Sequence, residues 1–103
     1  MPGAHLRIVY LQIAPGCDHR LELIQYLSPV DVTLEQRTSQ PGCAHLALYV
    51  DDLAAAYGEL SIKGVQFKSS PLDIPSGPMA GGKAVYLYGP DGVTLELMQA
   101  PPK

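Results

Sequence analysis

Two stretches of the chain repeat the same alternation of apolar and polar residues. The first runs from Val-Tyr-Leu at 9–11, through a loop with Pro and Gly, to Leu-Glu-Leu at 21–23. The second runs from Val-Tyr-Leu at 85–87, through a similar loop, to Leu-Glu-Leu at 95–97. Alternation with a period of two is typical of β-strands. Each stretch is therefore predicted to be a β-hairpin, and the repeat indicates a duplicated β-rich module.

A strand and a helix are predicted between the two hairpins. Residues 44–50 are apolar and predict a short strand. Asp52 is a suitable N-cap for a helix, and Gly64 is placed to end that helix in a left-handed conformation. The intervening residues at helical spacing form one apolar stripe: Leu53, Ala56, Tyr57 and Leu60.

The segment between this helix and the second hairpin completes the pattern. Residues 65–69 predict a third strand, and the prolines and glycines of 70–82 predict a long mobile loop. The order from residue 44 onward is strand, helix, strand, strand, strand. We therefore predict an α+β fold with a βαβββ module, preceded by a hairpin from an incomplete first module.

The predicted organisation is a single domain over residues 1–103, because a chain of 103 residues has room for one domain at most. Its parts are a remnant hairpin (1–29), a linker (30–43) and a complete second module (44–100).

Composition excludes several classes of protein. The chain is 47% hydrophobic and 17% charged, which is typical of a globular protein. A net charge of −3 without a Lys/Arg cluster speaks against nucleic acid and membrane as partners. The N-terminal residues lack the pattern of a signal peptide, so a cytoplasmic location is expected. Cys17 and Cys43 have no metal-binding spacing and are expected to be free thiols.

Three ionisable residues lie on the faces of strands opposite to the leucines. Aligning the hairpins places Glu22 at the position of Glu96, and His45 lies opposite its apolar neighbours on the strand over 44–50. If these faces curl into one cleft, an imidazole and two carboxylates converge there. Such a set suits a divalent first-row metal with open positions for substrate oxygens. The metal would polarise a carbonyl or stabilise an enolate.

Ordinary roles compete with this interpretation. A lone Glu on a strand is usually exposed to solvent, and the repeat is the reason to consider Glu22 and Glu96 further. A lone His such as His45 is more often a hydrogen-bonded structural residue than a ligand. His5 and His19 fall outside the shared face and are expected at the surface. The tyrosines are interpreted mainly as packing residues of the sheet.

Three segments together resemble the vicinal oxygen chelate superfamily, which includes glyoxalase I, methylmalonyl-CoA epimerase, extradiol dioxygenases and bleomycin-resistance proteins. They are residues 42–53, 63–65 and 89–97. In that superfamily two βαβββ modules form a cupped sheet around a metal, and the ligands come from the first and last strands of each module. The first hairpin resembles the back half of module one, so the resemblance covers nearly the whole chain.

The resemblance implies three metal ligands here: Glu22, His45 and Glu96. The fourth ligand of the family has no counterpart. A divalent ion (Ni, Co, Mn, Fe or Zn) is the implied cofactor. In the glyoxalase-like branch a metal-bound Glu also moves protons, which implies catalytic roles for Glu96 first and Glu22 second.

We therefore predict a metal-dependent enzyme of the glyoxalase, epimerase or dioxygenase type, acting as a lyase, isomerase or dioxygenase on a small oxygen-chelating substrate. One alternative is a metal-free small-molecule-binding protein of the bleomycin-resistance type. Another is a truncated member without catalytic activity. The incomplete module leaves an unpaired sheet edge, which predicts a homodimer. Exchange of elements between the two copies is one way to form it.

Overall fold

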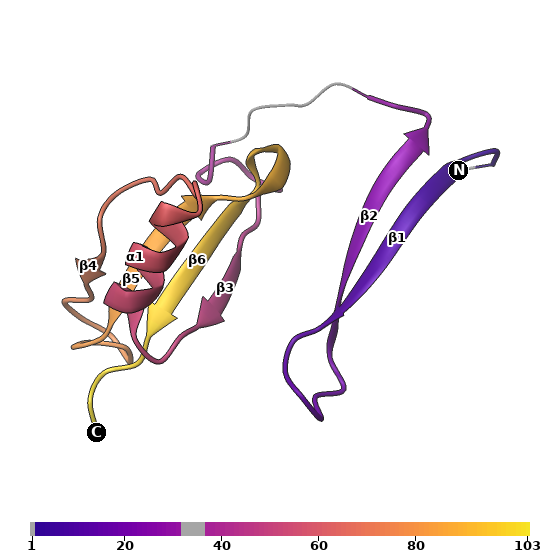
Figure 1. Ribbon diagram of the computed structural model, residues 1–103. Coiled ribbons are helices and arrows are strands. Elements are labelled where there is room, and N and C mark those ends of the chain that lie inside the picture. The colour runs from indigo at the N-terminus through magenta and orange to yellow at the C-terminus, as the bar shows by residue number, and fades with distance from the viewer. Residues whose placement is uncertain (1, 32–36) are drawn as a thin grey trace. The chain divides into compact units, whose positions relative to one another are not determined.

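The computed structural model describes residues 2–31 and 37–103, so residues 32–36 of the predicted linker lie outside the described residues. The chain divides into two compact units, Met1–Thr33 and Leu34–Lys103 (Figure 1). The assembly of both units into a single domain stays a prediction.

The first unit is an antiparallel hairpin, as the alternation predicted. Its strands are β1 (His5–Gln12) and β2 (Arg20–Ser28). The register pairs Tyr10 with Glu22 across the two strands. Nearly every side chain of both strands is exposed to solvent, including most of the apolar ones.

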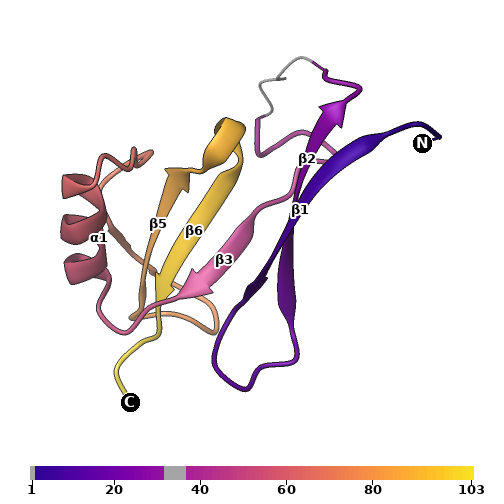
Figure 2. The same cartoon turned by 45° about the vertical axis from the view of Figure 1, so that its right-hand side comes forward.

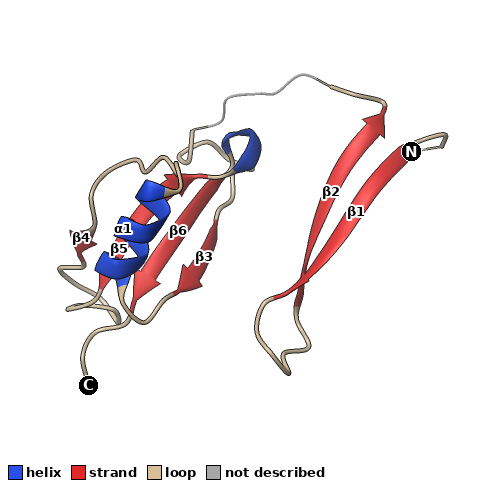
Figure 3. Cartoon of the chain, viewed as in Figure 1, coloured by secondary structure: helices blue, strands red, loops and turns tan. Residues whose placement is uncertain are grey.

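The second unit is a four-stranded sheet with one helix, and it confirms the predicted α+β class and element order. The strand order is β3-β6-β5-β4, in which β3 runs parallel to β6 and the other neighbours are antiparallel. Figures 2 and 3 show the helix α1 lying over one face of this sheet. The elements are β3 (Leu46–Tyr49), α1 (Leu53–Ile62), β4 (Leu72–Asp73), β5 (Lys83–Tyr88) and β6 (Thr94–Gln99).

Both predicted ends of the helix are confirmed. Asp52 is the N-cap, and its Oδ1 accepts a hydrogen bond of 3.1 Å from the backbone N–H of Ala55. At the other end Gly64 has a φ of 90°. The backbone N–H of Gly64 donates to the carbonyl of Ser61, and that of Val65 donates to the carbonyl of Leu60. This pair of bonds is the Schellman arrangement, which satisfies carbonyls that the last turn leaves without partners.

The core lies between α1 and the sheet. Its four buried apolar side chains are Leu53, Val85, Leu87 and Leu97. Apolar side chains of α1 and of the segment that follows it, among them Tyr57 and Phe67, pack around this cluster. Burial of one such side chain stabilises the fold by about 1.5–3 kcal/mol. Because side chains alternate along a strand, burial of Val85, Leu87 and Leu97 against α1 turns Tyr86 and Glu96 to the other face of the sheet.

The prediction of a continuous strand over 65–69 was wrong. Only Phe67 forms a bridge there, to Leu87 of β5. Four residues then separate Phe67 from the short strand β4, which begins at Leu72. Pro71 separates the two paired segments, and proline has no N–H to donate to a strand ladder.

The segment over 70–82, predicted as one long loop, is divided by a short strand. It contains β4, and the segment after β4 is closed by two backbone hydrogen bonds. The N–H of Ile74 donates to the carbonyl of Gly82 at 2.9 Å, and the N–H of Gly81 donates to the carbonyl of Ile74 at 3.0 Å.

The two cysteines, Cys17 and Cys43, are free thiols, as expected, and both are half-buried. In the part of the chain that the structure describes, no helix has the length and apolar character needed to cross a membrane.

Candidate metal and substrate site

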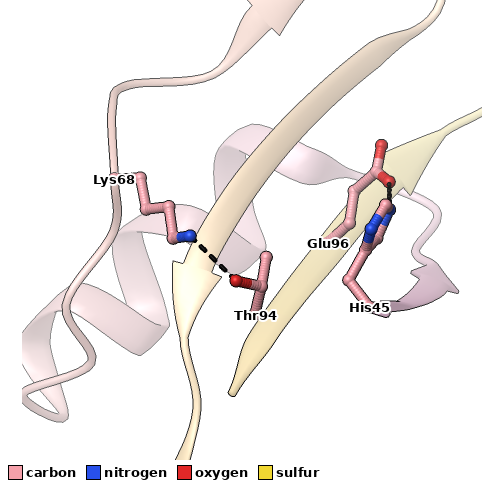
Figure 4. Close-up of polar contacts among 4 residues, drawn as sticks. All are labelled: His45, Lys68, Thr94 and Glu96. Carbon is pink, nitrogen blue, oxygen red and sulfur yellow. Dashed lines mark hydrogen bonds and ion pairs between the residues drawn. The ribbon is translucent and has the colours of Figure 1, made fainter. Parts of the chain in front are cut away.

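The second unit brings together two of the three residues that were predicted to share a site. His45 immediately precedes β3, and Glu96 lies on the neighbouring strand β6. Because Leu97 is buried beneath α1, the adjacent Glu96 faces the opposite side of the sheet. Nε2 of His45 lies 3.1 Å from Oε1 of Glu96 (Figure 4), and the Glu96 side chain is only 10% exposed.

Tyr86 completes a small polar cluster with this pair. It lies directly across from Glu96 in the antiparallel register of β5 and β6. Its ring meets the His45 ring edge to face, with centroids 5.4 Å apart and planes at 75°. Burial, the negative charge of Glu96 and a hydrogen bond to Glu96 raise the pKa of Tyr86 above its ordinary value of 10.0. Tyr86 and Glu96 are therefore electrostatically coupled neighbours on one face of the sheet.

A pocket of about 320 Å³ opens beside this cluster. Its lining residues are Thr38, His45, Lys68 and Tyr86. The Lys68 ammonium donates a hydrogen bond of 2.8 Å to Oγ1 of Thr94, as Figure 4 shows, and lies 5.0 Å from the centroid of the Tyr88 ring. A cavity of this volume is in the range of small-molecule sites, which begins at about 300 Å³.

The donor atoms of His45 and Glu96 have a spacing that fits a divalent metal ion. Two ligand atoms that each lie about 2.1 Å from one ion, at right angles to one another, are about 3 Å apart. The Nε2–Oε1 distance of 3.1 Å is compatible with this separation, and it is also the distance of a direct hydrogen bond between the two side chains. One imidazole nitrogen and one carboxylate oxygen also form a suitable donor set for first-row metals.

The third predicted ligand, Glu22, lies on β2 of the first unit, where its cross-strand partner is Tyr10. Within residues 37–103, no third His, Cys, Asp or Glu joins His45 and Glu96. The role of Glu22 as a ligand and as a catalytic residue therefore stays a prediction. His5 and His19 are both exposed, as expected for surface residues.

Tyr86, Lys68 and Thr94 are the site residues that sequence reasoning missed. Tyr86 was interpreted as a packing residue, although its alternation with Val85 and Leu87 already placed it on the face of Glu96. Lys68 had no comparable signal, because the break in the predicted strand over 65–69 decides where its side chain lies.

Comparison with known proteins agrees with this architecture. The model of the Glyoxalase/Bleomycin resistance protein/Dioxygenase superfamily matches residues 5–97. The chain is also 37% identical, over 99 residues, to a 2-epi-5-epi-valiolone epimerase from Actinomyces sp. That match covers 95% of this chain and 53% of the relative, so the chain spans about half the length of the curated relative.

Two solved structures are similar to the chain. A glyoxalase family protein from Bacillus cereus superimposes with a TM-score of 0.74 at 16% identity, covering 96% of this chain and 64% of that protein. The protein SMU.1112c superimposes with a TM-score of 0.62 at 26% identity, covering 94% of this chain and 80% of that protein. The first similarity concerns the fold alone.

Proposed function

The chain belongs to the glyoxalase/bleomycin resistance protein/dioxygenase superfamily, and on this basis we propose that it acts as a divalent-metal-dependent epimerase on a small oxygen-chelating substrate. The observation that carries the proposal is the contact between Nε2 of His45 and Oε1 of Glu96, on the sheet face opposite the helix. Similarity to an enzyme named as an epimerase supports this reaction among those of the superfamily.

His45 and Glu96 would hold the metal ion, and Glu22 is proposed as the third protein ligand. A bound divalent ion would supply a Lewis acid that polarises a substrate carbonyl. The remaining requirements fall on the protein. Glu96 contacts the His45 ring and has Tyr86 as its cross-strand neighbour, and we propose that these two residues orient its carboxylate before substrate arrives.

Proton transfer is the second role proposed for Glu96. Epimerisation beside a carbonyl breaks one C–H bond, and a carboxylate oxygen of Glu96 takes the proton while the electron pair moves toward the carbonyl oxygen. A proton returned to the opposite face of the same carbon inverts it. A second acid, in its protonated form, would supply that proton, and no net oxidation or reduction occurs. The catalytic role proposed for Glu22 rests on the family resemblance.

A metal-free binding protein is the second candidate function, and the pocket favours it. The cavity of about 320 Å³ is lined partly by an aromatic ring, which suits capture of a small molecule without chemistry. A stable small-molecule complex that forms equally well in the presence of a metal chelator would select this function over the epimerase.

The metal content of the purified full chain tests the proposed site. We expect His45→Ala and Glu96→Gln each to lower the affinity for a divalent ion at least about tenfold, because each removes a donor. Glu22→Gln is expected to act in the same direction. His19→Ala is the matched control, since His19 is exposed in the hairpin loop, and it should leave metal content unchanged. Equal metal content in all five proteins would disprove the shared site.

A further inference from the structure

We propose that Lys68 forms an anion subsite, so that the substrate of this pocket carries a carboxylate or phosphate group. The inference rests on the proposed function and deepens it, because it names the class of substrate: a small carbonyl compound with one anionic end. It rests on the lysine, its neutral neighbours and the pocket that it lines.

Lys68 differs from two other lysines of the second unit in its partner. Lys63 pairs with Glu59 at 3.3 Å, and Lys83 pairs with Asp73 at 2.7 Å. Lys68 makes no ion pair with any described residue; its partners are a hydroxyl and an aromatic ring. Among the described residues, no carboxylate therefore lies within ion-pair distance of its ammonium.

The neutral partners hold the ammonium in place and leave its charge available. Oγ1 of Thr94 accepts a hydrogen bond of 2.8 Å from the ammonium. The ammonium also lies over the Tyr88 ring, 5.0 Å from its centroid, which is a cation–π contact. An ammonium has three N–H donors, so others remain for a ligand. Because Lys68 also lines the pocket with His45 and Tyr86, those donors are accessible from the proposed substrate site.

The sheet sets the distance between the anionic end and the reacting carbon. Thr94 and Glu96 lie two residues apart on β6, so they share one face at a separation of about 6.6 Å. A substrate whose anion contacts Lys68 therefore presents to Glu96 a carbon that lies a few bonds away. The volume of about 320 Å³ suits a molecule of this length.

Titration of the metal-free full chain with inorganic phosphate, followed by amide chemical shifts, tests the subsite. We expect saturable shifts near Lys68, Thr94 and Tyr86 that weaken as ionic strength rises. Lys68→Gln should weaken phosphate binding roughly fivefold, the effect of losing one favourable pair of charges. Lys68→Arg keeps the charge and should retain binding.

Lys83→Gln is the matched control, because it removes the same charge from a lysine that already has a carboxylate partner. Binding that is equally weak in both glutamine variants would overturn the subsite, as would unchanged binding in Lys68→Gln or shifts that never saturate. Metal content is expected to be unaffected by Lys68→Gln. Failure of the anion subsite is thereby distinguished from failure of the metal site, which the His45 and Glu96 variants report.

Discussion

The two hairpins carry the same cross-strand pair in the same register. In the first unit Tyr10 pairs with Glu22, and in the second Tyr86 pairs with Glu96. The apolar neighbours correspond as well, since Val9 faces Leu23 just as Val85 faces Leu97. The repeat seen in the sequence is thus a repeat of structure down to individual partners.

The surroundings of the hairpins differ. β5 and β6 are flanked by other strands and covered by α1, so Leu97 is only 7% exposed, whereas its counterpart Leu23 is 49% exposed. Glu96 has His45, the residue before β3, beside it, and the first unit has no third strand among its described residues. The second Tyr-Glu pair is a candidate site because neighbouring elements bury its Glu and add an imidazole.

Truncation of the equivalent leucines gives the largest expected difference between the hairpins. Leu97→Ala should lower the free energy of unfolding by about 2–5 kcal/mol, because it leaves a cavity beneath α1. Leu23→Ala removes the same atoms from an exposed position and should change it by less than about 0.5 kcal/mol. Urea denaturation measures both, followed by the helix signal for Leu97→Ala and by the amide chemical shifts of β1 and β2 for Leu23→Ala.

A large loss in Leu23→Ala would contradict this contrast. It would show that the apolar face of the first hairpin is covered in solution, as the predicted homodimer requires. Sedimentation of the same variant would then show whether a second copy provides the cover.

The sequence predicted most of what depends on local pattern. Alternation located both hairpins and the face of Glu96, and Asp52 and Gly64 located the two ends of α1 because caps are determined by neighbouring residues. The position of Lys68 was not predictable in the same way. The place of its side chain depends on how far the segment around Phe67 stays paired with β5, and that pairing joins residues about twenty positions apart in the chain.

The helix is one element that the first hairpin lacks, and its N-cap allows a smaller test of what the helix contributes. Asp52→Ala removes the acceptor for the N–H of Ala55 and should cost about 1 kcal/mol of stability. Asp52→Asn keeps an acceptor and should cost a few tenths at most. Urea denaturation measures both variants, and equal losses would mean that the charge of Asp52, rather than the cap, stabilises the helix.

The smallest expected effect concerns the pH dependence of stability in the metal-free protein. Partial burial and the nearby Glu96 raise the pKa of Tyr86 above 10.0, so the folded state retains a proton that the unfolded state releases. Stability is therefore lost as pH rises from about 10 through the folded-state pKa. Tyr86→Phe should remove that loss, which urea denaturation at several pH values measures. Tyr10→Phe changes the equivalent position of the first hairpin and is the matched control. If Tyr10→Phe removed the same pH-dependent loss, the loss would not come from Tyr86 and its neighbour Glu96.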